Sequence, residues 1–99
     1  RADVREVCFR GANLSEADFR GADLREVDFR EANLTFANFS NADLREANLE
    51  QAHLENANLQ GTILTGARLR GANFQGADLR EVDLTGVDLT GALLEGTLF

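Results

Sequence analysis

The residues of this chain that could do chemistry are one cysteine, one histidine, seventeen acidic residues and ten arginines, with no lysine. Cys8 and His53 stand 45 positions apart, so neither a metal cluster nor a cysteine–histidine pair is expected. We interpret Cys8 as a free thiol and His53 as a solvated surface residue. No pattern places two carboxylates in a desolvated pocket, and no phosphate-binding glycine motif is present. The sequence therefore predicts a protein that is not an enzyme and binds no metal or cofactor.

A five-residue period organises the whole chain. Leu or Phe recurs at every fifth position from Phe9 to Phe99, and Ala, Val or Thr stands two positions earlier. On a helix, successive repeats would rotate by about 140°, and on a flat strand they would point to opposite faces. Neither element could bury these side chains together. The period therefore predicts a solenoid that bends every five residues around a central core.

The repeat has the form A(D/N)LXX in residues 12–16, 22–26 and 77–81 (ANLSE, ADLRE and ADLRE). With these segments the chain closely resembles the pentapeptide-repeat family over essentially all of its 99 residues. The resemblance implies an all-β fold, a right-handed quadrilateral β-helix with four pentapeptides in each coil. It implies little about function.

A longer register of 20 residues supports a four-sided coil independently of the resemblance. Arg5, Arg25 and Arg45 lie 20 positions apart, as do Glu6, Glu26 and Glu46. Residues 20 apart should therefore stack in neighbouring coils, about 4.8 Å from each other. Since no linker interrupts the repeat, residues 1–99 are expected to form one domain of about five coils.

The inward positions define the expected core. They are filled mainly by leucine, with Phe9 and Phe29 facing Phe19 and Phe39 near the start of the chain. The expected core positions include Leu14, Leu24, Leu34, Leu44, Leu54, Leu64, Leu79, Leu84 and Leu89, beside Ala12, Ala22, Ala32, Ala52 and Ala72. One coil buries too little apolar surface to offset the ordering of 20 residues, so a lone coil should not fold.

Two kinds of polar or small residue mark the expected bends. Asp or Asn precedes the central Leu in thirteen or more repeats, and such side chains bond to nearby backbone. Glycine takes the second place after Leu where a tight corner needs a positive φ. These glycines are Gly61, Gly66, Gly71, Gly76, Gly86, Gly91 and Gly96.

The outward charges give the candidate partner surface. Arginine should stack on arginine and glutamate on glutamate, with diagonal pairs of opposite sign relieving the repulsion. The candidate surface residues are Arg5, Glu6, Arg25, Glu26, Arg45 and Glu46. This ladder is either a solvated face that keeps the protein soluble or a recognition stripe. Since no positive face dominates, direct binding of nucleic acid is not expected.

Four outward positions are apolar. Phe36 and Ile63 are expected to be isolated exposed residues. Leu93 and Leu98, with Phe99, lie in the last coil beside an unpaired backbone edge, and we predict an end contact there. Its occupant would be a second copy, giving an end-to-end homodimer, or further sequence.

Two functions remain open at this point. The first is a non-enzymatic protein-interaction or structural scaffold module whose partner is another protein. The alternative is a DNA mimic that binds DNA gyrase, as the resemblance to quinolone-resistance proteins of the family implies. Such a mimic should present an acidic stripe along many coils. No apolar run approaches the roughly 20 residues that span a bilayer, so we expect no membrane contact and a cytoplasmic location.

Overall fold

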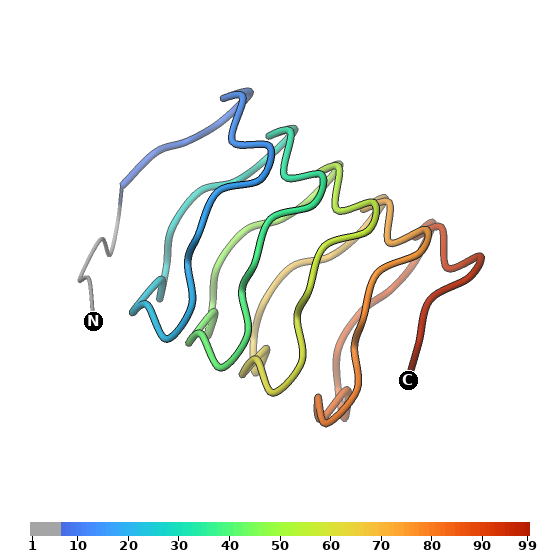
Figure 1. Cartoon of the computed structure of the whole chain (residues 1–99). Coiled ribbons are helices and arrows are strands. Elements are labelled where there is room, and N and C mark those ends of the chain that lie inside the picture. The colour runs from blue at the N-terminus through green and yellow to red at the C-terminus, as the bar shows by residue number, and fades with distance from the viewer. Residues whose placement is uncertain (1–6) are drawn as a thin grey trace.

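The backbone winds into stacked coils joined by single parallel β-bridges. The computed structural model describes residues 7–99, which contain no helix and no extended strand. Fourteen isolated bridges among these residues each join positions 20 apart, as Asp23 joins Asp43 and Asp43 joins Ile63. One coil therefore takes 20 residues, and the first and last of the described residues lie at opposite ends of the stack (Figure 1). Within residues 7–99, no helix is long and apolar enough to cross a membrane.

Each coil has four sides of five residues, and every side ends at a corner. The sides are named here by their order along the coil. The first side holds residues 22–26, 42–46, 62–66 and 82–86; the second 7–11, 27–31, 47–51, 67–71 and 87–91; the third 12–16, 32–36, 52–56, 72–76 and 92–96; the fourth 17–21, 37–41, 57–61, 77–81 and 97–99. The register of the bridges stacks equal positions of one side directly on each other.

The corners are residues in the left-handed backbone conformation. Every fifth residue from Gly11 to Gly96 has a φ between 59° and 75°. The amide that follows a corner donates to the carbonyl of the preceding inward residue, as Ala32 does to Phe29 at 3.0 Å. The predicted glycine corners are thus confirmed. Nine corners carry another residue, which the sequence did not indicate: Glu16, Glu26, Glu31, Phe36, Asn41, Glu46, Gln51, Asn56 and Glu81.

The core is a column of inward side chains along the coil axis. Leu24, Leu34, Leu44 and Leu54 have no exposed surface. Near the start of the chain the core is aromatic: Phe9 stacks on Phe29 with ring centroids 5.5 Å apart, and Phe19 stacks on Phe39 at 5.1 Å. The facing stacks also meet edge to face. The predicted aromatic end is therefore confirmed.

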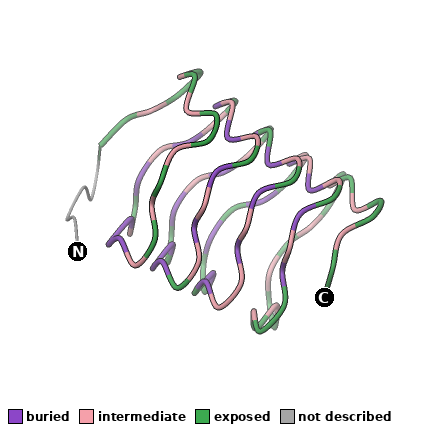
Figure 2. Ribbon diagram, viewed as in Figure 1, coloured by how far each residue is buried: buried purple, intermediate pink, exposed green. Residues whose placement is uncertain are grey.

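Burial falls off toward the two ends of the stack (Figure 2). Leu14, Leu84 and Leu89 were predicted as core residues but are only partly buried, and so is Ala12. A middle coil is covered on both faces by its neighbours, whereas the outer coils of residues 7–99 are covered on one. The repeat pattern cannot reveal this difference because large apolar residues fill the inward positions of every coil, whether it lies in the middle or at the end of the stack.

Candidate protein-interaction surface

Most of the outward Asp and Asn side chains accept hydrogen bonds from the backbone. In thirteen five-residue segments of residues 7–99, the Asp or Asn side chain accepts a hydrogen bond from the amide two positions later, as Asn38 does from Ser40 at 2.9 Å. In each of these segments, the local bond satisfies the backbone donor just before the corner. The expected bond between these side chains and the nearby backbone is confirmed.

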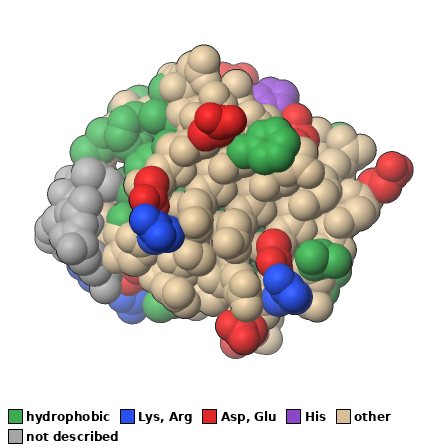
Figure 3. Space-filling model, viewed as in Figure 1, with side chains coloured by type: hydrophobic (Ala, Val, Ile, Leu, Met, Phe, Trp, Pro, Cys, Tyr) green, Lys and Arg blue, Asp and Glu red, His purple; other side chains and the backbone are tan. Residues whose placement is uncertain are grey.

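Where arginine stands two positions after Asp, the same carboxylate also holds the guanidinium group. In the pair Asp43–Arg45, the arginine Nε donates to Oδ1 at 2.9 Å and Nη2 donates to Oδ2 at 2.6 Å. Five such two-point pairs occur within residues 7–99: Asp18–Arg20, Asp23–Arg25, Asp28–Arg30, Asp43–Arg45 and Asp78–Arg80. A planar guanidinium matches a carboxylate in this geometry, so these long side chains have fixed positions. Figure 3 shows arginines lying against acidic side chains on one face.

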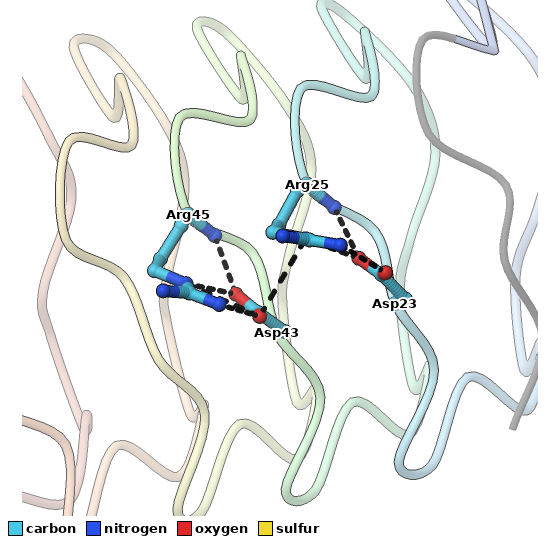
Figure 4. A network of polar contacts seen from close by, with 4 residues as sticks. All are labelled: Asp23, Arg25, Asp43 and Arg45. Atoms are coloured by element: carbon cyan, nitrogen blue, oxygen red, sulfur yellow. Dashed lines mark hydrogen bonds and ion pairs between the residues drawn. The ribbon is translucent and has the colours of Figure 1, made fainter.

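On the first side, two of these pairs combine into one network (Figure 4). Asp23 and Asp43 occupy bridged positions, and Arg25 Nε lies 3.9 Å from Asp43 Oδ2 in the next coil. Asp43 is only 3% exposed, so its charge lies almost wholly inside the surface. A buried carboxylate requires compensation, which the two arginines supply.

The electrostatics of Asp43 reflect this arrangement. Hydrogen bonds from the Arg45 side chain have the largest effect and hold the pKa of the Asp43 carboxyl below its ordinary value. The Arg45 amide and the charges of Arg45 and Arg25 act in the same direction, while burial opposes them. In return, the carboxylate raises the pKa of Arg45. Asp43 is therefore ionised at neutral pH and anchors Arg45.

The glutamates beside these arginines have a different environment. Glu26 and Glu46 are exposed corner residues, and neither forms an ion pair within residues 7–99. With Arg25, Arg45, Thr65 and Gly66 they line an open depression of about 310 Å³. The surface thus combines fixed guanidinium groups with unpaired carboxylates. It has the polar character of a protein-binding rim and no enclosed pocket for a substrate.

The predicted surface residues are brought together only in part. Arg25, Glu26, Arg45 and Glu46 do lie side by side around the depression, whereas Arg5 and Glu6 fall outside the described residues. One expectation needs correction. Diagonal pairs between arginine and glutamate were expected, but the main partner of Arg25 and of Arg45 is the Asp two positions earlier, and the diagonal contact of Arg25 is to Asp43.

The anchoring role of Asp23 and Asp43 was not predicted from the sequence, where they are two of the many Asp and Asn residues that precede an inward leucine. Both are buried. The signal that could have found them is the spacing Asp-Leu-Arg, which puts a carboxylate and a guanidinium on the same side of one strand-like segment. Thr65 and Gly66 also line the depression and were not predicted.

Of the other predicted residues, Ile63 lies on the first side, bridged to Asp43, and the rest lie on other sides of the coil. Leu93, Leu98 and Phe99 are exposed in the last coil, and Phe36 and Ile63 are exposed as expected. Cys8 is an exposed free thiol. His53 is exposed on the third side, with its Nδ1 3.7 Å from Glu55 Oε1.

Comparison with known proteins gives a consistent result. The family model of pentapeptide repeats matches in eight copies, over residues 1–35, 32–71 and 62–99. No curated protein sequence matches the chain. Among solved structures, a pentapeptide repeat protein from the thylakoid lumen of Arabidopsis thaliana is 30% identical, with a TM-score of 0.80, over 97% of this chain and 63% of that protein.

Two cyanobacterial structures are also similar. Rfr23 from Cyanothece 51142 is 36% identical over 98% of this chain and 63% of its own, with a TM-score of 0.62. HetL from Nostoc, a pentapeptide repeat protein involved in the regulation of heterocyst differentiation, is 35% identical over 98% of this chain and 51% of its own, with a TM-score of 0.54. This chain spans between 51% and 63% of the length of these three proteins.

Proposed function

The chain belongs to the pentapeptide-repeat family, and from that membership we propose that it is a non-enzymatic protein-interaction or scaffold module built on a right-handed, quadrilateral β-helix. Its partner is another protein, which binds the first side around Arg25, Glu26, Arg45 and Glu46. A regulatory role like that of HetL in heterocyst differentiation would need such a binding surface more than a catalytic centre.

One observation carries this proposal: the Asp23–Arg25–Asp43–Arg45 network fixes two arginines at the rim of the depression. A partner that binds pre-ordered side chains loses less conformational entropy than one that must order them. The hydrogen bonds of Arg45 to Asp43 use Nε and Nη2, which leaves its Nη1 group to donate to a partner. The unpaired Glu26 and Glu46 offer acceptors beside it.

The gyrase-binding DNA mimic is the weaker alternative. In the corner column of the first side, Glu26 and Glu46 are followed by Gly66 and Gly86, so the unpaired carboxylates do not continue along the stack. Seven of the eight arginines within residues 7–99 form ion pairs, which neutralise seven acidic residues. A continuous acidic stripe is therefore not favoured.

The test is partner capture with charge-reversed variants. Glu26→Lys/Glu46→Lys changes the surface without breaking an ion pair of the described chain, whereas Arg25→Glu/Arg45→Glu would place new carboxylates against buried Asp23 and Asp43. The matched control is Glu50→Lys/Glu81→Lys, which makes the same change in net charge elsewhere.

A protein captured by the wild type and the control but lost by Glu26→Lys/Glu46→Lys would support the proposal, provided that circular dichroism shows all three folded. Equal capture by both double variants would contradict it. Recovery of DNA gyrase, with inhibition of its supercoiling activity, would favour the alternative.

We also propose that the end of the stack contacts a second copy. Leu93, Leu98 and Phe99 are each at least half exposed. Burying them between two chains would remove apolar surface from water. Sedimentation equilibrium should therefore detect a dimer that is lost in Leu93→Ser/Leu98→Ser, and a monomer at high concentration would rule out the contact.

A further inference from the structure

We propose that the third side of the coil is a second interaction surface, and that its partner is a basic protein segment that carries apolar side chains. This surface is separate from the first side, because the two sides lie opposite each other in the four-sided coil. Its central feature is the corner residue Phe36.

Folding alone does not account for Phe36. Its side chain is among the most exposed of the large hydrophobic residues, at 60%, and its backbone is left-handed with a φ of 60°. Glycine and asparagine adopt that conformation most readily, and the same corner column holds Asn56, Gly76 and Gly96. A bulky residue here incurs steric strain without the benefit of burial. Its ring is, however, well placed to contact another molecule.

The charges of the third side define the partner. The third side has no arginine within residues 7–99, whereas each of the other three sides has at least two. Its acidic residues are Glu16, Glu55 and Glu95, and His53 is the nearest basic group to Glu55 at 3.7 Å. That distance is too long for a hydrogen bond, and Glu55 Oε1, which is itself buried, accepts none from the described residues. A cation from a partner would therefore meet no arginine or lysine on the third side within residues 7–99.

The acidic residues and the aromatic ring are close in space. The Phe36 amide donates to the Glu55 carbonyl at 3.0 Å, and the Glu16 amide donates to the Thr35 carbonyl at 2.9 Å. Glu16, Phe36 and Glu55 therefore lie in three successive coils, about 4.8 Å apart. Lysine or arginine stems can pack on the ring while their charged ends reach the flanking carboxylates.

This chemistry separates the possible partners. A nucleic acid or an anionic membrane would be repelled by the glutamates, since no cation on this side offsets them. A basic segment with apolar residues satisfies both the carboxylates and the ring. Aromatic residues at the centre of such contacts commonly dominate the binding energy.

The experiment is a titration followed by nuclear magnetic resonance. The ¹⁵N-labelled chain is titrated with the blocked peptide Lys-Leu-Lys-Leu-Lys and, separately, with Glu-Leu-Glu-Leu-Glu. We expect the basic peptide to shift the amide signals of residues 33–36 and 53–56 in a saturable way, and the acidic peptide to leave them unchanged. Phe36→Gly should raise the Kd for the basic peptide at least about tenfold, the loss typical of an aromatic anchor.

Two controls keep the outcome clear. Phe36→Gly should remain folded, because glycine already occupies two corners of the same column, and circular dichroism checks this. Ile63→Ser removes an exposed apolar residue from the first side and should leave the Kd unchanged. Unchanged affinity of Phe36→Gly, no shift at millimolar peptide, or equal shifts by the acidic peptide would each overturn the proposal.

Discussion

In residues 7–60, eight of the ten corners carry a side chain, whereas in residues 61–99 seven of the eight corners are glycine. The first region also has four of the five two-point Asp–Arg pairs and the four stacked phenylalanines. The second region has Phe74 as its one fully buried aromatic residue among those described. The backbone path is the same in both regions, so it can be built with or without outward contacts.

This difference indicates which corner residues have a side chain that the backbone path itself does not require. A glycine corner avoids the steric cost of a positive φ, which is about 1–2 kcal/mol for another residue. Corners that carry a side chain have this steric cost but present exposed groups to solvent. At the boundary the two types fit together: a Cβ added to Gly61 would lie 2.5 Å from Asn41 Oδ1, so the Asn41 side chain occupies the space that glycine leaves. Arg25, Glu26, Arg45, Glu46 and Phe36, which define two of the proposed interaction surfaces, are all in the first region, whereas the proposed end contact at Leu93, Leu98 and Phe99 is in the second.

The largest expected difference between the two regions is in the free energy of unfolding of core variants. Phe39→Ala should lower the free energy of unfolding by about 3–5 kcal/mol, because it removes a fully buried ring that stacks on Phe19 and meets Phe29 edge to face. Leu89→Ala, at a partly buried position of the second region, should cost about 1–2 kcal/mol since solvent already reaches that site. Urea unfolding followed by circular dichroism measures both. Equal losses would show that the aromatic region is no more tightly packed than the end coils.

The next test compares two Asp–Arg pairs. Asp43→Asn should cost about 1–3 kcal/mol, because Asp43 is buried, bonds Arg45 at two points and lies near Arg25. Asp78→Asn breaks a single pair with Arg80 in the second region and should cost under about 1 kcal/mol. The same unfolding measurement applies. If Asp78→Asn proved as costly as Asp43→Asn, the diagonal contact with Arg25 would be irrelevant to stability.

The contrast between the two regions should also appear in how the free energy of unfolding depends on pH. Hydrogen bonds from the Arg30 side chain hold the pKa of Asp28 at about 2, below its ordinary value of 3.8. A carboxyl group with a lowered pKa stabilises the fold above its ordinary pKa and loses that contribution as the pH falls through the lowered value. From pH 4 to pH 2, the wild type should therefore lose up to about 2 kcal/mol through Asp28.

Asp88 is the matched position for this test, since it lies on the same side of the coil as Asp28. Its pKa is lowered mainly by the Thr90 hydroxyl, and it is more exposed. Asp28→Asn should flatten the acid limb of the stability curve more than Asp88→Asn does. Urea midpoints at pH 6 and pH 2.5 give the comparison, and the reverse order of the two variants would show that the Arg30 contact does not set the acid sensitivity.

The repeat predicted the fold well because inward positions obey a strict rule. The five-residue period, the 20-residue register and the facing phenylalanines are all written in residue types that only a bent coil can bury together. The site was harder to predict because outward positions obey no such rule. Asp23 and Arg25 look like two independent surface charges in the sequence, and the structure shows that they form one ion pair with a buried carboxylate and a partly exposed guanidinium. Corners such as Glu26 were missed because propensity alone favours glycine there.

The smallest expected effect comes from exchanging the corner types within one column. Glu26 and Gly86 occupy equivalent corners with φ values of 65° and 75°. Gly86→Ala should cost about 1 kcal/mol: a Cβ there meets no atom within 4 Å, so the left-handed backbone is the remaining penalty, partly offset by a less flexible unfolded chain. Glu26→Gly should change stability by less than about 1 kcal/mol, since relief of strain and added flexibility act in opposite directions. Thermal and urea unfolding of both variants give the two values. If Glu26→Gly were strongly destabilising, the Glu26 side chain would contribute to folding itself, and the view of the first region as a binding surface that accepts strain would lose its basis.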